Sequence, residues 1–378
     1  MRVLFVSGDY PPDHGGIASY VSCLASVLRK RGHEVSVIAR NRTGRAVTER
    51  EIEGIRILRV PCPPIYPLHV WIQGKLYKKV FRDEIAGNDV VHYHSPLVPF
   101  IDSETPSIAT VHVLIAEYLS EGISEFGADF AFARLAYPFV SLEERRCISR
   151  VDEAIALHGG TVDGIAQIRG TTGAEVHVIP PGVDGEFYGV RSRGAELGTK
   201  FFLYSGRLIE RKGLKVLVHA YALFASRYKD VRLILTGTGP LEKQLRVLAH
   251  RLGVGDSVQL LGKVDESLLR DLYSSCTAFL LPSFYEGISI SVLEAMACGA
   301  PTVVTRLPGF SSVFTHEREV LMVEPGDVHA LSSAMAQLYV NRDEAFNLAR
   351  RGRDFVLTNM DWRVLSSRFE EVYRIALS

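Results

Sequence analysis

The chain has 378 residues, of which 47% are hydrophobic and 23% charged, which is enough apolar material for two domains of about 180 residues each without metals or disulfides. Lysines plus arginines equal aspartates plus glutamates at 43 each, so charge gives no reason to expect a nucleic-acid partner. The five cysteines lack CxxC spacing, which argues against a disulfide framework or a zinc site and favours a reducing cytoplasm.

No apolar run approaches the roughly 18 residues that span a bilayer. The N-terminal sequence MRVLFVSGDYPP has an apolar run too short for the core of a signal peptide. We therefore expect a soluble or peripheral protein.

Short apolar runs alternate with helical patterns along the whole chain. In the first half, runs typical of buried parallel strands occupy 3–6, 34–39, 55–60, 89–94, 107–112, 153–157 and 175–180, and the clearest helix spans 17–31. In the second half, strands are predicted at 201–206, 231–237, 258–262, 278–283, 301–305 and 321–325, and helices at 213–228, 240–252, 266–275, 290–298 and 328–340. Two successive βα arrays predict an α/β protein of two doubly wound, Rossmann-like domains.

The domain boundaries follow from composition. Residues 181–198 are rich in Pro and Gly where they begin and are predicted to be a linker between domains at 1–180 and 199–358. The last segment, 359–378, carries apolar residues at helical spacing and is predicted to be a packing helix.

Residues suited to ligand binding follow the first strand of each half, where ligands bind in open α/β sheets. Gly15 and Gly16 precede a helix and let the backbone approach an anion. Arg207 and Lys212 flank a turn and can clamp a diphosphate. A glycine turn and a basic surface turn remain the alternatives.

The stretch FYEGISISVLEAMACG, 284–299, places two glutamates eight residues apart with no other charge between them. Glu286 is expected just before a helix and Glu294 about two turns along it, a rise of about 12 Å. That is roughly the reach of a diphosphate with a sugar at each end, so one carboxylate can bind a transferred sugar and the other a ribose. The alternative is one cleft-facing glutamate and one solvated helix glutamate.

Several motifs together resemble those of glycosyltransferase family 4, retaining enzymes of the GT-B fold. They are GGIASYVSCLASVLRKRGHEV, TVH, PPGVDGEFY, SGRLIERKG and PSFYEGISISVLEAMACGAPTVVT, and they cover essentially the whole chain in the family's order. The resemblance implies two Rossmann-like domains facing each other across a cleft, with an acceptor held by 1–180 and a nucleotide-sugar donor by 199–358. It also implies that 359–378 crosses back to the first domain and that no metal or other cofactor is required.

The resemblance also implies roles for single residues. Arg207 and Lys212 would neutralise the donor diphosphate, Glu286 would hold hydroxyls of the transferred sugar, and Glu294 would bind the ribose. His112 would line the reaction centre, so that the predicted catalytic group is His112, Arg207, Lys212 and Glu286. The remaining donor-binding residues would be Gly15, Gly16, Gly262, Lys263, Val264, Gly287, Ile288 and Ser289. A structural, hydrogen-bonded histidine is the alternative for His112.

The predicted function is transfer of a hexose from a UDP- or GDP-sugar to a hydroxyl of a glycan or lipid-linked acceptor, with retention and without a metal. Fixed cations and helix amides stabilise the charge of a departing diphosphate. Glu286 and Glu294 are too far apart for the close carboxylate pair of retaining glycosidases, so we expect front-face substitution. The chain contains no D-x-D motif, and His92 and His94 are expected to point to opposite faces of a strand and not to form a metal site.

Two departures from the family pattern leave the role of their segments open. After PTVVT the chain has RLPGFSSVFTHEREV, with Pro308, Gly309 and Ser312 in place of the usual Gly-Gly…Glu element. The usual serine-led segment after EAIAL is replaced by HGGTVDGI.

The acceptor side is less defined. The stretches 63–82 and 126–146 mix aromatic, apolar and basic residues, which suits either peripheral contact with an anionic membrane at its cytoplasmic face or simple coverage of the sheet. The alternative functions are a GT-B sugar phosphorylase, a nucleotide-sugar hydrolase or epimerase, and a non-catalytic nucleotide-sugar-binding subunit. A dehydrogenase is disfavoured because the GxG at 237–239 is followed by Glu242 where the third glycine belongs.

Overall fold

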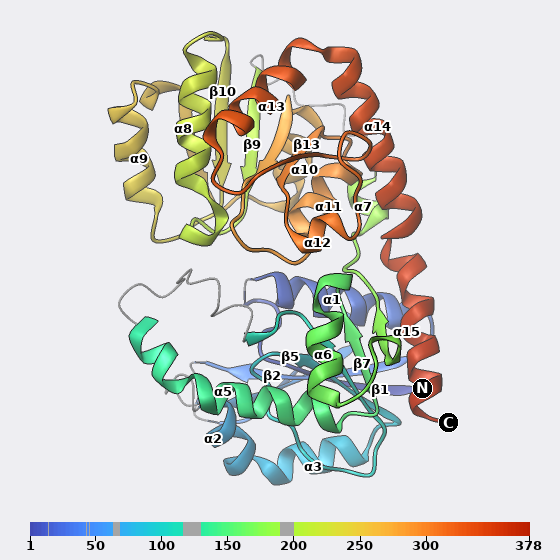
Figure 1. The fold of residues 1–378 in the computed structure, drawn as a ribbon. Helices are drawn as coiled ribbons and strands as arrows, with labels where there is room; N and C mark the ends of the chain where they lie inside the picture. Colours follow the sequence, from blue (N-terminus) through green and yellow to red (C-terminus); the bar gives the residue numbers. More distant parts are fainter. Residues whose placement is uncertain (14, 43, 45, 63–68, 116–129, 190–199) are drawn as a thin grey trace. The chain divides into compact units, whose positions relative to one another are not determined.

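The computed structural model describes residues 1–378 except 14, 43, 45, 63–68, 116–129 and 190–199 (Figure 1). The described chain forms two compact units. The first contains the described residues of 1–181 together with Trp362–Ser378, and the second contains Gly182–Asp361. Each unit is an α/β fold built around one sheet.

The sheet of the first unit has the strand order β3-β4-β2-β1-β5-β6-β7-β8. All neighbours are parallel except β3 and β4. Its strands are β1 (Arg2–Ser7), β2 (Glu34–Asn41), β3 (Thr48–Ile52), β4 (Ile55–Pro61), β5 (Val90–Ser95), β6 (Ser107–Val111), β7 (Glu153–Ala156) and β8 (Val176–Val178). Its α-helices are α1 (Gly16–Lys30), α2 (His69–Leu76), α3 (Lys78–Ala86), α5 (Phe130–Arg150), α6 (Val162–Arg169) and α15 (Trp362–Ala376), and 3-10 turns lie at Gly159–Thr161 and Gly173–Glu175.

The sheet of the second unit is parallel, with the order β11-β10-β9-β12-β13-β14. Its strands are β9 (Lys200–Ser205), β10 (Val231–Thr236), β11 (Val258–Gly262), β12 (Ala278–Leu281), β13 (Thr302–Thr305) and β14 (Leu321–Val323). The helices are α7 (Gly185–Tyr188), α8 (Leu214–Ala225), α9 (Glu242–Arg251), α10 (Glu266–Ser275), α11 (Ile290–Ala297), α12 (Pro308–Ser311), α13 (Val328–Val340) and α14 (Arg342–Asn359), with 3-10 turns at Glu210–Lys212 and Gly255–Ser257.

All the strands predicted from apolar runs form within one or two residues of the expected bounds. The sequence does not predict β3, because its residues TEREI are all exposed at the sheet edge and carry no apolar run. It does not predict α14 either, which contains seven charged side chains among RDEAFNLARRGRDFVLTN and buries a narrow stripe against α11.

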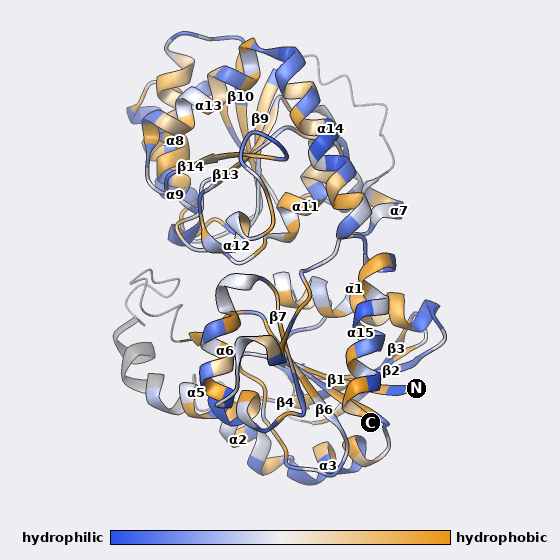
Figure 2. Ribbon diagram, turned by 45° about the vertical axis from the view of Figure 1, so that its right-hand side comes forward, coloured by the Kyte–Doolittle hydropathy of each residue, from blue (hydrophilic) through white to orange (hydrophobic). Residues whose placement is uncertain are grey.

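Each core consists of the strands and the helix faces turned toward them. In the second unit Phe201, Phe202, Leu203 and Tyr204 of β9 are all buried. Figure 2 shows hydrophobic residues on the strands and on the inner faces of the helices, and hydrophilic residues on the outer faces. Buried strands of this kind place functional side chains at the strand ends, where the core stops.

The C-terminal helix α15 packs against α1 in the first unit. Its residues Leu365, Phe369 and Tyr373 are buried at helical spacing. The Arg31 guanidinium donates two hydrogen bonds to the Glu370 carboxylate at 2.7 and 2.8 Å, so an ion pair closes the edge of this interface.

Candidate active site

The strand order of the second unit reverses between β9 and β12. The loops that leave neighbouring strands in opposite directions diverge at such a point and leave room for a ligand at the carboxyl edge. The loop after β9 contains Arg207, Arg211 and Lys212, and the loop after β12 contains Glu286. Of the predicted donor-binding residues of this unit, Arg207, Lys212 and Glu286 therefore lie on the two loops at the switch point.

Glycines allow these loops to pack backbone against backbone. Gly213 has φ 66°, and a Cβ there would lie 1.9 Å from the carbonyl oxygen of Pro282. The Phe284 amide donates to the carbonyl of Arg211 at 2.8 Å. The loop that carries the cations is thus fixed to the loop that carries Glu286.

Glu286 is the centre of a buried charge cluster. Its Oε2 accepts a hydrogen bond from Lys212 Nζ at 2.5 Å and lies 3.2 Å from Arg211 Nη1. The side chains of Glu286 and Lys212 are only 13% and 9% exposed. Burial by itself would raise the pKa of Glu286, but Arg211 and Lys212 outweigh it and lower that pKa to about 2. The carboxylate is therefore ionised at neutral pH and acts as an acceptor of hydrogen bonds.

Glu294 has a different environment and lies about one turn along α11, not the two turns expected from the sequence, because the helix begins only at Ile290. Its Oε2 accepts a hydrogen bond from the Tyr273 hydroxyl at 3.1 Å, and Tyr188 also hydrogen-bonds to it. Burial raises the pKa of Glu294 to about 7 despite these hydroxyls. The two glutamates thus differ in protonation as well as in position, and neither is a solvated surface residue.

The residues between the glutamates form the start of α11. Ser289 is its N-cap, and the Ser289 hydroxyl lies 2.9 Å from that of Ser291 instead of capping the helix. A Cβ at Gly309 would lie 2.2 Å from the carbonyl oxygen of Gly287. The segment that departs from the family pattern therefore packs directly on the backbone beside Glu286.

In the first unit the strand order reverses between β1 and β5. Gly15 and Gly16 follow β1 at the start of α1, and His112 follows β6, which is the neighbour of β5. His112 Nε2 lies 3.3 Å from His94 Nδ1, and the Tyr20 ring packs on His112 edge-on at 4.6 Å between centroids. Burial lowers the pKa of His112 to about 3, so its imidazole is neutral at pH 7.

Models of known protein families match both the N-terminal and the C-terminal part of the chain. The family model for "Glycosyltransferase Family 4" matches residues 14–187, and the model for "Glycosyl transferases group 1" matches residues 190–355. The chain belongs to glycosyltransferase family 4. The enzyme is a glycosyltransferase with the GT-B fold.

Curated relatives align along the full length of this glycosyltransferase. An uncharacterised glycosyltransferase of Methanocaldococcus jannaschii is 26% identical and covers 100% of this chain and 99% of its own. A GDP-mannose-dependent α-(1-6)-phosphatidylinositol monomannoside mannosyltransferase of Mycobacterium tuberculosis is 27% identical. The alignment covers 99% of this chain and 98% of that protein.

Solved structures share the fold. Sucrose-phosphate synthase from Thermosynechococcus elongatus matches with a TM-score of 0.81 at 21% identity, covering 99% of this chain and 98% of its own. Anabaena HepE in complex with UDP and glucose matches with a TM-score of 0.73 at 18% identity, covering 99% and 100%.

The structure adds residues of this glycosyltransferase that the sequence did not single out. Arg211 contacts Glu286, whereas Arg207 is exposed at the surface and its carbonyl accepts a hydrogen bond from Tyr204. Tyr273 and Tyr188 hold Glu294. The adjacent pair Arg211-Lys212 was a visible signal for the first contact, but no signal pointed to the tyrosines because they come from other helices.

Gly262, Lys263 and Val264 lie where β11 ends, at the edge of the second sheet. The Gly262 carbonyl accepts a hydrogen bond from the Gly237 amide at 2.7 Å, which fixes this loop beside the one that follows β10. Lys263 is exposed there. The contact of these residues with a nucleotide base stays a prediction.

The expectation that His92 and His94 point to opposite faces is wrong. Successive residues of a strand alternate, so residues two apart share a face. Their rings stack with centroids 4.4 Å apart, His92 Nδ1 lies 2.9 Å from the Tyr373 hydroxyl, and His92 Nε2 lies 2.7 Å from Thr110 Oγ1. Among the described residues, no group of three or more His, Cys, Asp or Glu side chains is arranged to hold a metal ion.

None of the helices within the described residues is long and apolar enough to span a membrane. The predicted stretches 63–82 and 126–146 each begin outside the described residues. Their described parts form α2, most of α3 and α5. The predicted linker 181–198 also lies partly outside the described residues, and its described part includes the short helix α7.

Proposed function

We propose that this glycosyltransferase moves a hexose from a nucleoside-diphosphate sugar to a hydroxyl of a glycan or lipid-linked acceptor, with retention of configuration and without a metal. The observation that carries the proposal is the buried cluster of Glu286, Lys212 and Arg211 at the switch point of the second sheet. It supplies an ionised carboxylate and two cations beside the start of a helix.

The two glutamates suit different hydroxyls of the donor. Glu286 is ionised, so it accepts hydrogen bonds from hydroxyls of the transferred sugar and strengthens them as positive charge develops on the ring. Glu294 has a pKa near 7 and two tyrosine partners, which suits a neutral diol such as the ribose. We assign no attacking role to either carboxylate.

The cations are assigned to the leaving group. A departing nucleoside diphosphate gains negative charge, and fixed positive groups that need no reorganisation stabilise that charge. Lys212 and Arg211 are held by Glu286, and Arg207 is exposed on the same loop. In a front-face reaction a leaving-phosphate oxygen takes the acceptor proton, so a neutral His112 positions groups at the reaction centre and is not the base.

Two donor classes have support from the relatives. HepE of Anabaena is in complex with UDP and glucose, and the M. tuberculosis relative is named as GDP-mannose-dependent. We therefore expect binding of UDP or GDP in preference to ADP or NAD.

A thermal-shift panel with UDP, GDP, ADP and NAD tests the donor site. A ligand at 100 times its Kd that binds only the folded protein stabilises by about 2.7 kcal/mol. We expect either UDP or GDP to raise the Tm of the parent protein but not that of Lys212→Ala. Lys215→Ala, which removes a lysine from an exposed ion pair, is the control and should keep the parent's Tm shift. Equal shifts in both variants would remove Lys212 from the donor site.

Product analysis separates transfer from its alternatives. With the matching nucleotide sugar, we expect a product whose anomeric configuration equals that of the donor by NMR coupling constants, and the same rate after dialysis against EDTA. Sugar phosphate formed from inorganic phosphate would indicate a phosphorylase instead, and free sugar formed at the same rate without any acceptor would indicate a hydrolase.

A further inference from the structure

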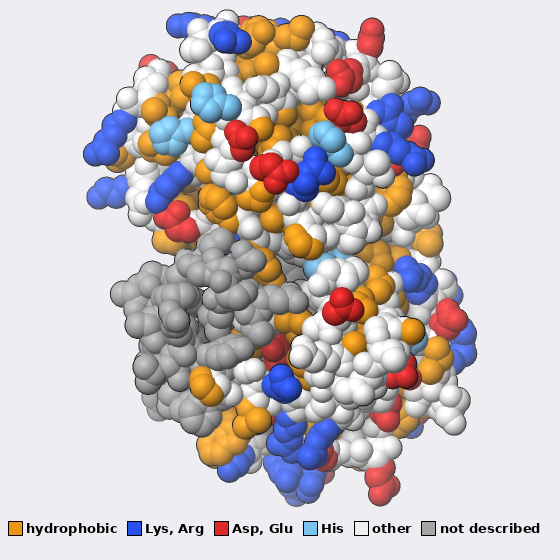
Figure 3. Space-filling model, in the orientation of Figure 1, with side chains coloured by type: hydrophobic (Ala, Val, Ile, Leu, Met, Phe, Trp, Pro, Cys, Tyr) orange, Lys and Arg blue, Asp and Glu red, His pale blue; other side chains and the backbone are white. Residues whose placement is uncertain are grey.

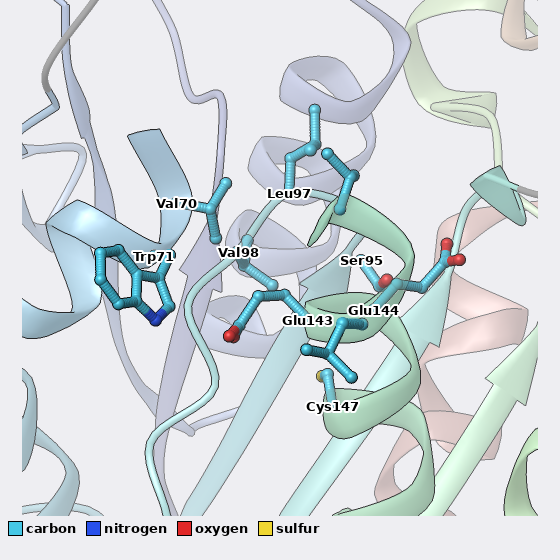
Figure 4. Close-up of a pocket in the computed structure, with 10 residues that line it drawn as sticks. Val70, Trp71, Ser95, Leu97, Val98, Glu143, Glu144 and Cys147 are labelled. Carbon is cyan, nitrogen blue, oxygen red and sulfur yellow. The ribbon is translucent and has the colours of Figure 1, made fainter. Parts of the chain in front are cut away.

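A second site lies in the first unit, at the carboxyl end of β5. A pocket of about 360 Å³ opens there between α2 and α5, a volume within the usual range for small-molecule sites. It is lined by Val70, Trp71, Ser95, Leu97, Val98, Val140, Leu142, Glu143, Glu144 and Cys147. Figure 4 shows Trp71 on the α2 side and Glu143, Glu144 and Cys147 on the α5 side. The two stretches with unexplained aromatic and basic residues thus meet in one cavity.

The lining is mainly apolar, and part of it faces solvent. Trp71 is 47% exposed and Leu142 is 63% exposed, although both belong to the pocket wall. Leu97 adopts φ 66°, a left-handed conformation that is unfavourable for a residue with a Cβ and is typical of functional sites. Exposed large apolar side chains around an apolar cavity indicate a binding site for an apolar group.

The acidic residues of the pocket do not prevent this. The Glu144 carboxylate is buried and accepts hydrogen bonds from the Ile115 amide at 3.1 and 3.3 Å. In Figure 4 it points away from Trp71, while the Glu143 carboxylate points toward the Trp71 side. Burial raises the pKa of Glu143, although the nearby Arg146 opposes this rise.

Two residues of the pocket wall accept hydrogen bonds from the loop that carries His112. The His112 amide donates to the carbonyl of Ser95, a pocket residue, at 3.0 Å. Ile115, three residues after His112, is held by Glu144 of the opposite wall. A molecule with its apolar end in the pocket therefore lies against the backbone that positions His112.

The surface beside the pocket is basic. Lys75, Lys78, Lys79 and Arg82 of α2 and α3 are exposed, and Lys75 Nζ lies 3.8 Å from the centroid of the Trp71 ring. Figure 3 shows Lys and Arg side chains gathered over α3, beside hydrophobic side chains over α2. Exposed aromatic and aliphatic groups next to clustered cations are typical of a face that contacts anionic lipid.

We infer that this pocket binds the hydrocarbon chain of an anionic, lipid-linked acceptor and places its hydroxyl-bearing head near His112. The identification of the chain as part of an acceptor rests on the proposed transferase function. The binding of a hydrocarbon chain rests only on the pocket and its basic rim. A water-soluble glycan acceptor would leave this cavity unused.

Alkyl phosphates with a terminal bromine, used below their micelle-forming concentration, test the chain site directly. Bromine quenches tryptophan fluorescence at short range, and Trp71 lines the pocket while Trp362, the only other tryptophan, is 4% exposed. We expect saturable quenching that is lost in Trp71→Phe. The affinity should rise roughly fourfold per added methylene until the pocket is filled. Inorganic phosphate should not compete.

Variants separate the pocket from surface adsorption. Leu142→Glu puts a charge at the exposed mouth without disturbing the core, and Val140→Phe reduces the volume. Both should weaken binding of the longest probe at least tenfold, and Leu223→Glu on the second unit, at another exposed leucine, should not. An affinity independent of chain length, or equal binding by Leu142→Glu and the parent, would overturn the inference.

The same preparations distinguish this inference from the proposed function. If UDP and GDP do not raise Tm but the chain-length dependence holds, the donor assignment fails and the hydrocarbon site stands. If a nucleotide binds and the alkyl phosphates do not, the transferase proposal stands and the acceptor is not held through a hydrocarbon chain in this pocket.

Discussion

Replacing Glu286 with glutamine should separate folding, donor binding and transfer. The carboxylate is held by Lys212 and Arg211 in a site where the Lys212 and Glu286 side chains are 9% and 13% exposed. Glutamine keeps the shape but leaves the two cations without their counter-charge. Removing one partner of a buried ion pair typically destabilises a protein by about 3–5 kcal/mol, because the other charge remains buried and unpaired.

The pKa of Glu286 gives an independent magnitude. Its decrease from 4.5 to about 2 corresponds to about 3 kcal/mol of stabilisation of the ionised form. A carboxyl whose pKa is lower in the folded state stabilises the fold above its unfolded pKa, and this contribution is lost as the pH falls from about 4.5 toward 2. The deficit of Glu286→Gln relative to the parent should therefore be full at pH 7 and shrink below pH 4.5.

Thermal unfolding at pH 7 and at pH 4, with Glu210→Gln as the control, measures this difference. Glu210 pairs with Lys215 on the surface of the same loop, where both side chains are nearly half exposed, so its loss should cost less than about 1 kcal/mol. Glu286→Gln should also retain binding of the nucleoside diphosphate, because the cations remain, while turnover falls strongly. A variant with the parent's Tm at pH 7, or with near-normal turnover, would refute the assignment of Glu286.

Three further outcomes follow from the described contacts. Because the pKa of Glu294 is raised to about 7, its ionisation destabilises the fold as the pH rises from 4.5 through 7, so Glu294→Gln should gain Tm relative to the parent at pH 8 and lose that gain at pH 4. Gly213→Ala should lower Tm more than Gly253→Ala, since both glycines have φ near 70° but only the first would place a Cβ against Pro282, as calorimetry of the two variants would show. Exhaustive dialysis against EDTA should leave turnover in a coupled nucleotide-release assay unchanged, and loss of turnover restored by a divalent cation would contradict the metal-independent proposal.

Much of the fold was predictable because its signals are local. Parallel strands covered on both faces are continuous apolar runs, so the sequences of β9 and β12 predict strands without any knowledge of the neighbouring strands. The sequence did not predict the highly charged helix α14 or the edge strand β3. Their stability comes from contacts with other elements, of α14 with α11 and of β3 with β4.

The candidate site also has one part that the sequence predicts and another part that it does not. Glu286 and Lys212 were predictable because each follows a strand, and strand ends meet at one edge of a parallel sheet. The tyrosines that bind Glu294 come from α7 and α10, and no spacing in the sequence relates Tyr188 to Tyr273.

The two histidines of β5 show that a strand can be predicted correctly while the faces to which its side chains point are assigned wrongly. His92 and His94 are two residues apart and therefore share one face of β5, where they stack and link Tyr373 of α15 to His112. This face is already occupied by protein hydrogen bonds, with Thr110 and Tyr373 on His92 and His112 on His94. The pair is therefore better explained as a support for His112 than as free ligands, because each ring nitrogen engaged by a neighbour is one that a metal would have to displace. The same strand ends at Ser95, whose carbonyl fixes the His112 amide, so β5 positions that residue through its backbone and through His94 at once.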